Sequence, residues 1–404
     1  MSAPDPTHPA TVDETITFIR ECCTALEPER VPLAEASGRV LREPVLAPED
    51  QPPFDRSSVD GFAVRLDDAS KRFHIVDRIR AGDWKPRQLQ PGEAVQIATG
   101  GALTGDGLQV VMKEDARASG DEVEILQRDN DRNIRFRGED ARTGTQLVSA
   151  GTQLSPGALA LLASIGHTQP LVTRLPRVLH VATGNEIVPP EQTPQTGQIR
   201  DSNTTLVRSF LQSHGVTPQQ VRVGEDRSAI DSALHAPRSA FAPDLLLISG
   251  GASVGEHDFT RSLLADLGYT IRISRTTTRP GKPLIFATRG NAVAFGLPGN
   301  PLAHFVCLNL YVRMALRGFS GATEADGFVN GLLADDFTAE ANARETLWPA
   351  RMTQRDGGVW LTPLAWRSSG DLTALATANA LVRIPSGCGK VARGTKLEFV
   401  PTEL

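Results

Sequence analysis

GLPGNPLAHF occupies residues 296–305 and directly follows the apolar run 292–295. Its second half predicts a helix, because Asn300 suits an N-cap and Pro301 suits the first helical position, where no N–H is needed. Apolar residues continue at helical spacing, and Gly318 is expected to end the helix. A strand that passes through glycines into a helix N-terminus directs N–H groups at one point, which favours a bound anion. Tight packing of a strand on a helix uses the same residues, so both interpretations fit this stretch alone.

Two other apolar runs end in a similar way. Residues 178–182 are followed by the loop TGNE (183–186), and residues 244–248 are followed by the loop SGGASVG (249–255). A helical pattern comes after each loop, and this alternation is typical of an open parallel α/β sheet. The carboxyl ends of parallel strands meet at one edge, where such sheets bind their ligands. We therefore predict that the three loops lie together.

The loop SGGASVG has the composition of a phosphate cradle. It matches neither the Walker A order nor the GxGxxG order of dinucleotide-binding proteins, but it offers consecutive N–H groups with little side-chain bulk. The candidate anion-binding residues in this loop are Ser249, Gly250, Gly251, Ser253 and Gly255. A flexible connection between strand and helix has the same composition. The coincidence of three such loops at one edge favours a phosphorylated ligand.

Charged residues in neighbouring loops suit the same kind of ligand. Arg279 and Lys282 stand on the stiff turn RPGKP, and two fixed cations favour a dianion. Glu186, Asp226 and Asp258 lie within or just after loops and form a hard-oxygen set suited to Mg²⁺ beside phosphate. Taken alone, each of these residues also fits a solvated turn or a helix cap.

Length and patterning divide the chain into several domains. At 404 residues it is too long for one compact core. Thr11 and Glu14 form a capping box before an amphipathic helix, and short strand-like pieces predict a β-rich region in 45–139 and another after residue 330. We expect four domains: residues 1–44 together with 140–175, residues 45–139, residues 176–328, and residues 329–404.

Composition excludes several classes of protein. The net charge of −5 and the pI near 6.0 provide no basic footprint for nucleic acid or for an anionic membrane. No apolar run approaches the length of a membrane span, and the polar N-terminus lacks the apolar stretch of a signal peptide. The four cysteines show no CxxC spacing, which favours buried thiols over disulfides or a zinc site. We expect a cytoplasmic protein with no nucleic-acid or membrane partner.

Seven motifs, in this order, give the chain a family resemblance. They are PPFDRSSVDGFAVR (52–65), IATGGA (97–102), RGED (137–140), TGNE (183–186), SGGASVGEHD (249–258), RPGKP (279–283) and GLPGNP (296–301). Together they resemble the MoeA and gephyrin E-domain family, the molybdopterin molybdenumtransferases, over nearly the whole chain. Each motif is modest alone, but seven in the right order are highly specific.

The resemblance implies a mixed α/β multidomain fold, with elongated subunits that form a homodimer. Its central parallel α/β domain is expected to be similar to MogA-type molybdopterin adenylyltransferases, with β-rich domains flanking it. The implied reaction takes adenylylated molybdopterin and molybdate, inserts the metal with the help of Mg²⁺, and releases AMP. Further implied partners are an adenylyltransferase of the MogA or MoaB type and the molybdoenzymes that receive the product. The substrate cleft would lie between the α/β domain of one subunit and the β-rich second domain of the other.

Site residues follow from the same resemblance. It assigns activity or Mg²⁺ handling to Asp60, Thr99, Asp140, Glu186, Asp258 and Lys282. It assigns molybdate binding to Arg279, Lys282, Arg351 and Ser369. The turn residues Pro298, Gly299, Asn300 and Pro301 are expected to line the pocket for the pterin phosphate or the nucleotide. The chain departs from the family in having Arg279 where Lys is usual and Asn185 where Asp is frequent; Arg279 keeps the positive charge, and Asn185 removes a negative one near the expected metal.

Two other functions stay open at this point. One is a non-catalytic scaffold, since the E-domain of gephyrin also clusters receptors by dimerising. The other is a MogA-type adenylyltransferase, which would need only the α/β domain. The presence of Asp60, Asp140, Glu186 and Lys282 favours an active site over a scaffold, and the length outside the α/β domain favours molybdate insertion.

Overall fold

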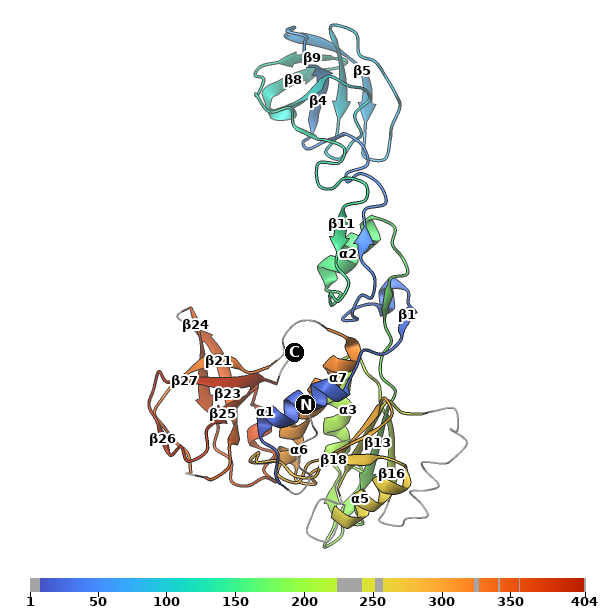
Figure 1. Ribbon diagram of the computed structural model, residues 1–404. Coiled ribbons are helices and arrows are strands. Elements are labelled where there is room, and N and C mark those ends of the chain that lie inside the picture. Colours follow the sequence, from blue (N-terminus) through green and yellow to red (C-terminus); the bar gives the residue numbers. More distant parts are fainter. Residues whose placement is uncertain are drawn as a thin grey trace. The chain divides into compact units, whose positions relative to one another are not determined.

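The computed structural model describes residues 8–223, 242–250, 257–322, 327–340, 342–355 and 357–402, without the side chains of residues 257 and 258. The chain forms two compact units (Figure 1). The first comprises Met1–Arg42, Gly151–Ser155 and Gln169–Leu404, and the second comprises Glu43–Ala150 and Pro156–Thr168.

A six-stranded sheet forms the centre of the first unit. Its strand order is β16 (Gln219–Val223), β13 (Val178–Thr183), β17 (Leu245–Ser249), β20 (Ala292–Leu297), β19 (Ile285–Arg289) and β18 (Thr270–Ile273). The first four strands are parallel, which confirms the predicted parallel α/β arrangement. β19 runs antiparallel to both of its neighbours, β20 and β18, and a tight hairpin at Gly290 and Asn291 joins it to β20.

Helices cover both faces of this sheet (Figure 1). Leu245 and Leu247 of β17 pack in the core that also contains α1 (Val12–Cys22), α3 (Asn203–Ser213) and α6 (Pro301–Cys307). Leu246 and Ile248 point to the opposite core, beside α5 (His257–Asp266). Alternate side chains of one strand are thus buried on both faces, which explains why these strands are continuous apolar runs.

The helix that starts at Pro301 is longer than the sequence suggested. α6 continues through a π-helical turn, Leu308–Val312, into α7 (Arg313–Ser320). The prediction that Gly318 ends the helix is wrong, because Gly321, with a φ of 70°, provides the left-handed cap. A Cβ on Gly318 would lie 2.5 Å from the carbonyl oxygen of Cys23. This glycine therefore allows α7 to pack against the residue that caps α1.

A closed barrel follows the α/β region in the same unit. It consists of β21 (Val329–Leu333), β24 (Gly358–Pro363), β23 (Thr346–Arg355), β25 (Ala380–Ile384) and β27 (Lys396–Pro401). Arg383 of β25 bonds to Glu345, to Glu398 and to Asp13 of α1, so one guanidinium ties the barrel to the first helix. The capping box predicted for α1 is confirmed, with Glu14 N donating to Thr11 Oγ1.

Short pairs complete the first unit. They are β1 (Pro28–Arg30) with β12 (Leu171–Thr173), β14 (Ile187–Val188) with β15 (Ile199–Arg200), and β22 (Phe337–Thr338) with β26 (Lys390–Val391).

The second unit is built on another six-stranded sheet. Its order is β7 (Leu108–Met112), β4 (Gly61–Arg65), β6 (Glu93–Ile97), β5 (Arg72–Ile79), β9 (Glu122–Ile125) and β8 (Ala116–Ser119). Phe62 and Val64 of β4 pack on one face and Ala63 on the other. The pairs β2 (Val45–Leu46) with β11 (Gln146–Val148) and β3 (Arg56–Ser57) with β10 (Ile134–Arg135), and the helix α2 (Pro156–Ser164), complete it. The β-rich character predicted for this region is confirmed.

No helix among the described residues is long and apolar enough to cross a lipid bilayer.

The contact at Gly318 leads to a prediction. Gly318→Ala should gain about 1 kcal/mol of helix propensity, but its methyl group would collide with the Cys23 backbone. Overpacking against rigid backbone costs about 1–3 kcal/mol or more, so we expect a net loss of about 1–2 kcal/mol in the free energy of unfolding. Urea denaturation measures it. Gly358→Ala, whose Cβ would meet its nearest atom at 3.8 Å, serves as the control. A Gly318→Ala protein as stable as the parent would show that α1 and α7 are not held at this distance.

Candidate functional site

A cavity of about 700 Å³ lies where the parallel strands of the first unit end. The loops after β13, β17 and β20 all line it, together with residues 199–203 and two residues of the segment 370–372. The predicted site residues that it brings together are Glu186, Ser249, Gly250, Pro298, Gly299, Asn300 and Pro301. We call this cavity the sheet-edge pocket.

Close backbone contacts bring the loops of the sheet-edge pocket together. Gly250 has a φ of 94°, and a Cβ there would lie 2.4 Å from the carbonyl oxygen of Thr183. Only glycine satisfies both conditions. Thr183 Oγ1 donates to the Ser249 carbonyl at 3.2 Å. Glu186, by contrast, is exposed and lines the cavity, so its carboxylate is available to a ligand.

The turn before α6 differs from its predicted form in one respect. Asn300 occupies the N-cap position with extended backbone, but its side chain does not cap the helix. Asn300 Nδ2 instead donates to Ser369 Oγ at 2.8 Å, and Leu302 N donates to the Ser369 carbonyl at 3.0 Å. The N–H group of Leu302, at the helix N-terminus that the sequence predicts to bind an anion, therefore already has an acceptor within the protein. The same bonds place Ser369, another predicted site residue, beside the turn.

A second cavity, of about 390 Å³, shares Asn300 with the first. The predicted residues Arg279, Lys282 and Ser369 line it. Two further cations that the sequence reasoning missed, Arg344 and Arg367, also line it. They belong to segments far from the RPGKP turn in sequence, so no motif spacing could have indicated them. We call this cavity the cationic pocket.

Arg279 is fixed at the wall of the cationic pocket. Its guanidinium lies 5.7 Å from the ring centre of Trp366, and its Nη2 donates to Glu340 at 2.6 Å. Arg279 Nη1 and Trp366 Nε1 are both buried and have no hydrogen-bond partner within the described part of the chain. Buried N–H donors without an acceptor are uncommon and costly. Their presence here fits an oxyanion as the natural acceptor.

Arg351 is placed apart from these residues. It lies in β23 opposite Thr362 of β24, is exposed, and is not among the residues that line either pocket. Its assignment to molybdate therefore rests on the family resemblance alone.

The second unit brings together two predicted residues from different motifs. Asp60 Oδ1 accepts from Thr99 N at 2.8 Å and from Thr99 Oγ1 at 2.9 Å. Lys113, which the sequence reasoning missed, lies 3.3 Å from Asp60 Oδ2. These bonds, above all the one from the Thr99 backbone, lower the pKa of Asp60 below its ordinary value. Asp60 is thus ionised at neutral pH. Asp140 is half-exposed and paired with Arg135.

Several predicted residues are outside the described structure. Asp226, Gly251, Ser253 and Gly255 lie outside the described residues. Asp258 is the second residue of α5, with no described side chain. Among the side chains that are described, no three His, Cys, Asp or Glu residues gather around a common point. Of the predicted Mg²⁺ ligands Glu186, Asp226 and Asp258, the structure therefore describes the side chain of Glu186 alone.

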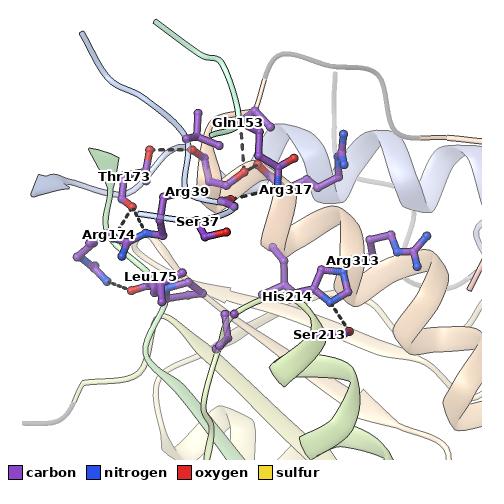
Figure 2. A pocket seen from close by; sticks show the side chains of 18 of the residues that line it. Ser37, Arg39, Gln153, Thr173, Arg174, Leu175, Ser213, His214, Arg313 and Arg317 are labelled. Carbon is purple, nitrogen blue, oxygen red and sulfur yellow. Dashed lines mark hydrogen bonds between the residues drawn. The ribbon is translucent and has the colours of Figure 1, made fainter. Parts of the chain in front are cut away.

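A third cavity in the first unit, of about 470 Å³, contains none of the predicted residues (Figure 2). Its polar lining includes several arginines, but Arg174 gives two hydrogen bonds to Asp244 and one to Glu27. Arg39 bonds to Glu29 and to the Thr173 carbonyl. The guanidinium groups of these two residues already have acceptors within the protein, which favours the cationic pocket as the place for a substrate anion.

Comparisons with known proteins identify relatives over nearly the whole chain. Family models match along the chain: the MoeA N-terminal region (domain I and II) over residues 10–166, a probable molybdopterin binding domain over 180–318, and the MoeA C-terminal region (domain IV) over 330–402. A protein of Bacillus subtilis (strain 168) named molybdopterin molybdenumtransferase is 32% identical over 393 residues, covering 94% of this chain and 91% of its own.

Two further relatives match over nearly the whole chain. A protein of the same name from Staphylococcus epidermidis is 28% identical and covers 98% of this chain and 96% of its own. The crystal structure of a molybdopterin biosynthesis MoeA protein from Pyrococcus horikoshii superposes with a TM-score of 0.77 at 27% identity, over 98% of this chain and 100% of that one. With its loops, barrel and β-rich unit all accounted for by these matches, the chain belongs to the MoeA family.

Proposed function

We propose that this protein is a molybdopterin molybdenumtransferase, which inserts molybdate into adenylylated molybdopterin and releases AMP. The observation that carries the proposal is the cationic pocket. It combines two predicted cations with two buried donors that have no acceptor within the described residues, and it adjoins a larger cavity at a sheet edge. A scaffold would not require buried donors without acceptors, because each of them lowers the stability of the fold.

The two pockets divide the substrates between them. The sheet-edge pocket has the size and the backbone-rich walls for a phosphorylated organic ligand. The cationic pocket suits a small tetrahedral dianion, because Arg279 and Lys282 supply positive charge from a stiff turn. Asn300 lies in both walls. Molybdate would therefore be held next to the pterin that receives it.

Arg279 is well suited to this role although lysine is usual in the family. A guanidinium stacked on an aromatic ring keeps a fixed orientation and offers several N–H donors in one plane. The indole of Trp366 provides that ring. Ser369, whose hydroxyl accepts from Asn300, adds an O–H group at the pocket's edge.

Mg²⁺ is part of the proposal, as a neutraliser of charge on the phosphoanhydride. This ion is usually held by one or two carboxylates together with substrate phosphates. Glu186, exposed at the sheet-edge pocket, fits that mode of binding, and Asp226 and Asp258 are proposed with it. The neutral side chain of Asn185 leaves Glu186 as the carboxylate of this loop.

We further propose a cytoplasmic homodimer of four-domain subunits with the boundaries given above. Asp60, Thr99 and Asp140 would act in a site shared between two copies of the chain. An adenylyltransferase of the MogA or MoaB type would supply the substrate, and molybdoenzymes would receive the product. Two observations support this proposal: the family membership of the chain and the pairing of Asp60 with Thr99. These two residues place a carboxylate beside a hydroxyl group on the second unit, whose residues line neither pocket.

The reaction itself is the first test. The purified protein, given adenylylated molybdopterin, molybdate and Mg²⁺, should release AMP, and omission of molybdate or Mg²⁺ should abolish the release. Lys282→Ala should lower the rate about 10- to 100-fold, the loss expected for one charged hydrogen bond to an anion. Lys390→Ala, at an exposed position of β26, should not change it. No AMP from the parent protein under these conditions would refute the proposed function and leave the scaffold alternative.

The shared site is tested by complementation. Homodimers of Asp60→Asn and of Lys282→Ala should each release AMP much more slowly than the parent. After subunit exchange, half of the sites in a heterodimer would combine an intact Asp60 with an intact Lys282, so activity should return in proportion to the heterodimer fraction. Exchange is verified by native mass spectrometry of tagged chains. Mixtures as inactive as their parents after verified exchange would place both residues in the same subunit's site.

A further inference from the structure

The hydroxyl of Ser249 lies in a buried chain of hydrogen bonds beneath the sheet-edge pocket. Gln220 Nε2 is 3.0 Å from His180 Nδ1, and His180 Nε2 is 2.6 Å from Ser249 Oγ. Ser249 Oγ is 3.5 Å from His304 Nε2, and His304 Nδ1 is 3.0 Å from the Pro298 carbonyl oxygen. The chain therefore runs from β16 across β13 and β17 to α6 and ends at the turn before α6.

The direction of every bond follows from its last member. A carbonyl oxygen can only accept, so His304 Nδ1 carries the proton and His304 Nε2 accepts from the Ser249 hydroxyl. Because Ser249 donates to His304, it accepts from His180 Nε2, and His180 Nδ1 accepts from the Gln220 amide. Both imidazoles must be neutral for this pattern. Burial provides that condition, since it lowers the pKa of His180 to about 3 and that of His304 to about 4.

At the turn, two consecutive carbonyls are held by donors from different helices. The Pro298 carbonyl accepts from His304 of α6, and the Gly299 carbonyl accepts from Asn203 Nδ2 of α3 at 2.8 Å. Both peptide bonds are trans. In a trans peptide the N–H group points away from the C=O group. The N–H groups of Gly299 and Asn300 therefore point away from His304 and Asn203.

These two N–H groups remain available to a ligand. Gly299 and Asn300 are exposed and line the sheet-edge pocket. Neither N–H donates a hydrogen bond within the part of the chain that the structure describes. The restraint of the carbonyls thus determines which groups the turn presents to the cavity.

We propose that His304 is a positioning residue, which with Asn203 orients residues 298–300 so that their N–H groups receive the phosphate of the bound nucleotide. In this scheme Ser249 holds His304 and its hydroxyl does not contact the ligand, which revises the ligand-binding role predicted for its side chain. The nature of the ligand rests on the proposed function, whereas the orientation of the turn does not.

Two substitutions of His304 separate positioning from simple packing. His304→Asn retains an amide N–H near the place of Nδ1 and can still donate to Pro298, whereas His304→Leu fills the space without a donor. AMP affinity, measured by calorimetry, should fall at least tenfold in His304→Leu and no more than about threefold in His304→Asn. Val306→Ala, at a fully buried apolar position of the same helix, is the control for lost stability and should bind AMP like the parent.

NMR gives a readout that does not depend on the ligand. In the parent, ¹⁵N-labelled histidine should show the Nδ1–H tautomer for His304 and the Nε2–H tautomer for His180. The amide signals of Gly299 and Asn300 should move in His304→Leu and stay in place in His304→Asn. If His304→Leu does not fold, His180→Leu against His180→Gln provides the same comparison at a residue outside the pocket wall.

The outcomes are distinct. Unchanged Gly299 and Asn300 signals in the leucine variant, or equal AMP affinity in the leucine and asparagine variants, would overturn the positioning role. A parent protein that shows the expected tautomers and amide shifts but binds no AMP would overturn the proposed ligand and leave the positioning of the turn standing.

Discussion

The parallel pairing of β13, β17 and β20 is the constraint on which the rest of the structure depends. Ser249 at the end of β17 lies opposite Ala182 of β13 and Leu297 of β20, so the three strands end within a residue of one another. Each strand is buried on both faces by separate apolar cores. A slip of one residue would exchange the two faces of every strand. The register that packs the cores therefore also fixes the loops at one edge.

The cationic pocket depends on a second contact, between the α/β region and the barrel of the same unit. Arg279 N donates to the Glu345 carbonyl and Leu347 N donates to the Arg279 carbonyl, at 2.8 Å each, so the RPGKP turn is attached to the start of β23. Ser369 attaches the start of α6 to another barrel segment. These bonds bring Arg344, Trp366 and Arg367 to a turn that is remote from them in sequence. The barrel therefore completes the site.

The features that the sequence predicted are those encoded within a few residues. Apolar runs, glycine loops and the Thr11–Glu14 capping box each have a local signature, and each is present. The failures have long-range causes. Glycine is a common helix stop, so the sequence predicts one at Gly318. The missing side chain instead allows α7 to pack against Cys23, which caps α1. Asn300 occupies the predicted N-cap position, but its side chain donates to Ser369 and accepts no hydrogen bond from the helix.

Residues of the site were missed for the same reason. Trp366 and Arg344 belong to no recognisable motif. They are part of the site because the barrel contact brings them to Arg279. His180 and His304 stand in an apolar strand and an apolar helix, where a histidine gives no sign of its partner. The chain that joins them through Ser249 exists only because β17 lies between β13 and α6.

The two pockets present polar groups to a ligand by opposite means. In the sheet-edge pocket, hydrogen bonds from His304 and Asn203 hold two carbonyls, and the N–H groups of the same peptides belong to exposed residues that line the cavity. That arrangement costs the fold little, because each of the two carbonyls has a donor. In the cationic pocket, the buried Arg279 Nη1 and Trp366 Nε1 lack one among the described residues, and each such donor costs about 1–3 kcal/mol. Under the proposed function, an oxyanion that accepts from both donors would recover that cost. On the same proposal, these donors would strengthen the binding of a small inorganic anion, which offers few atoms for other contacts.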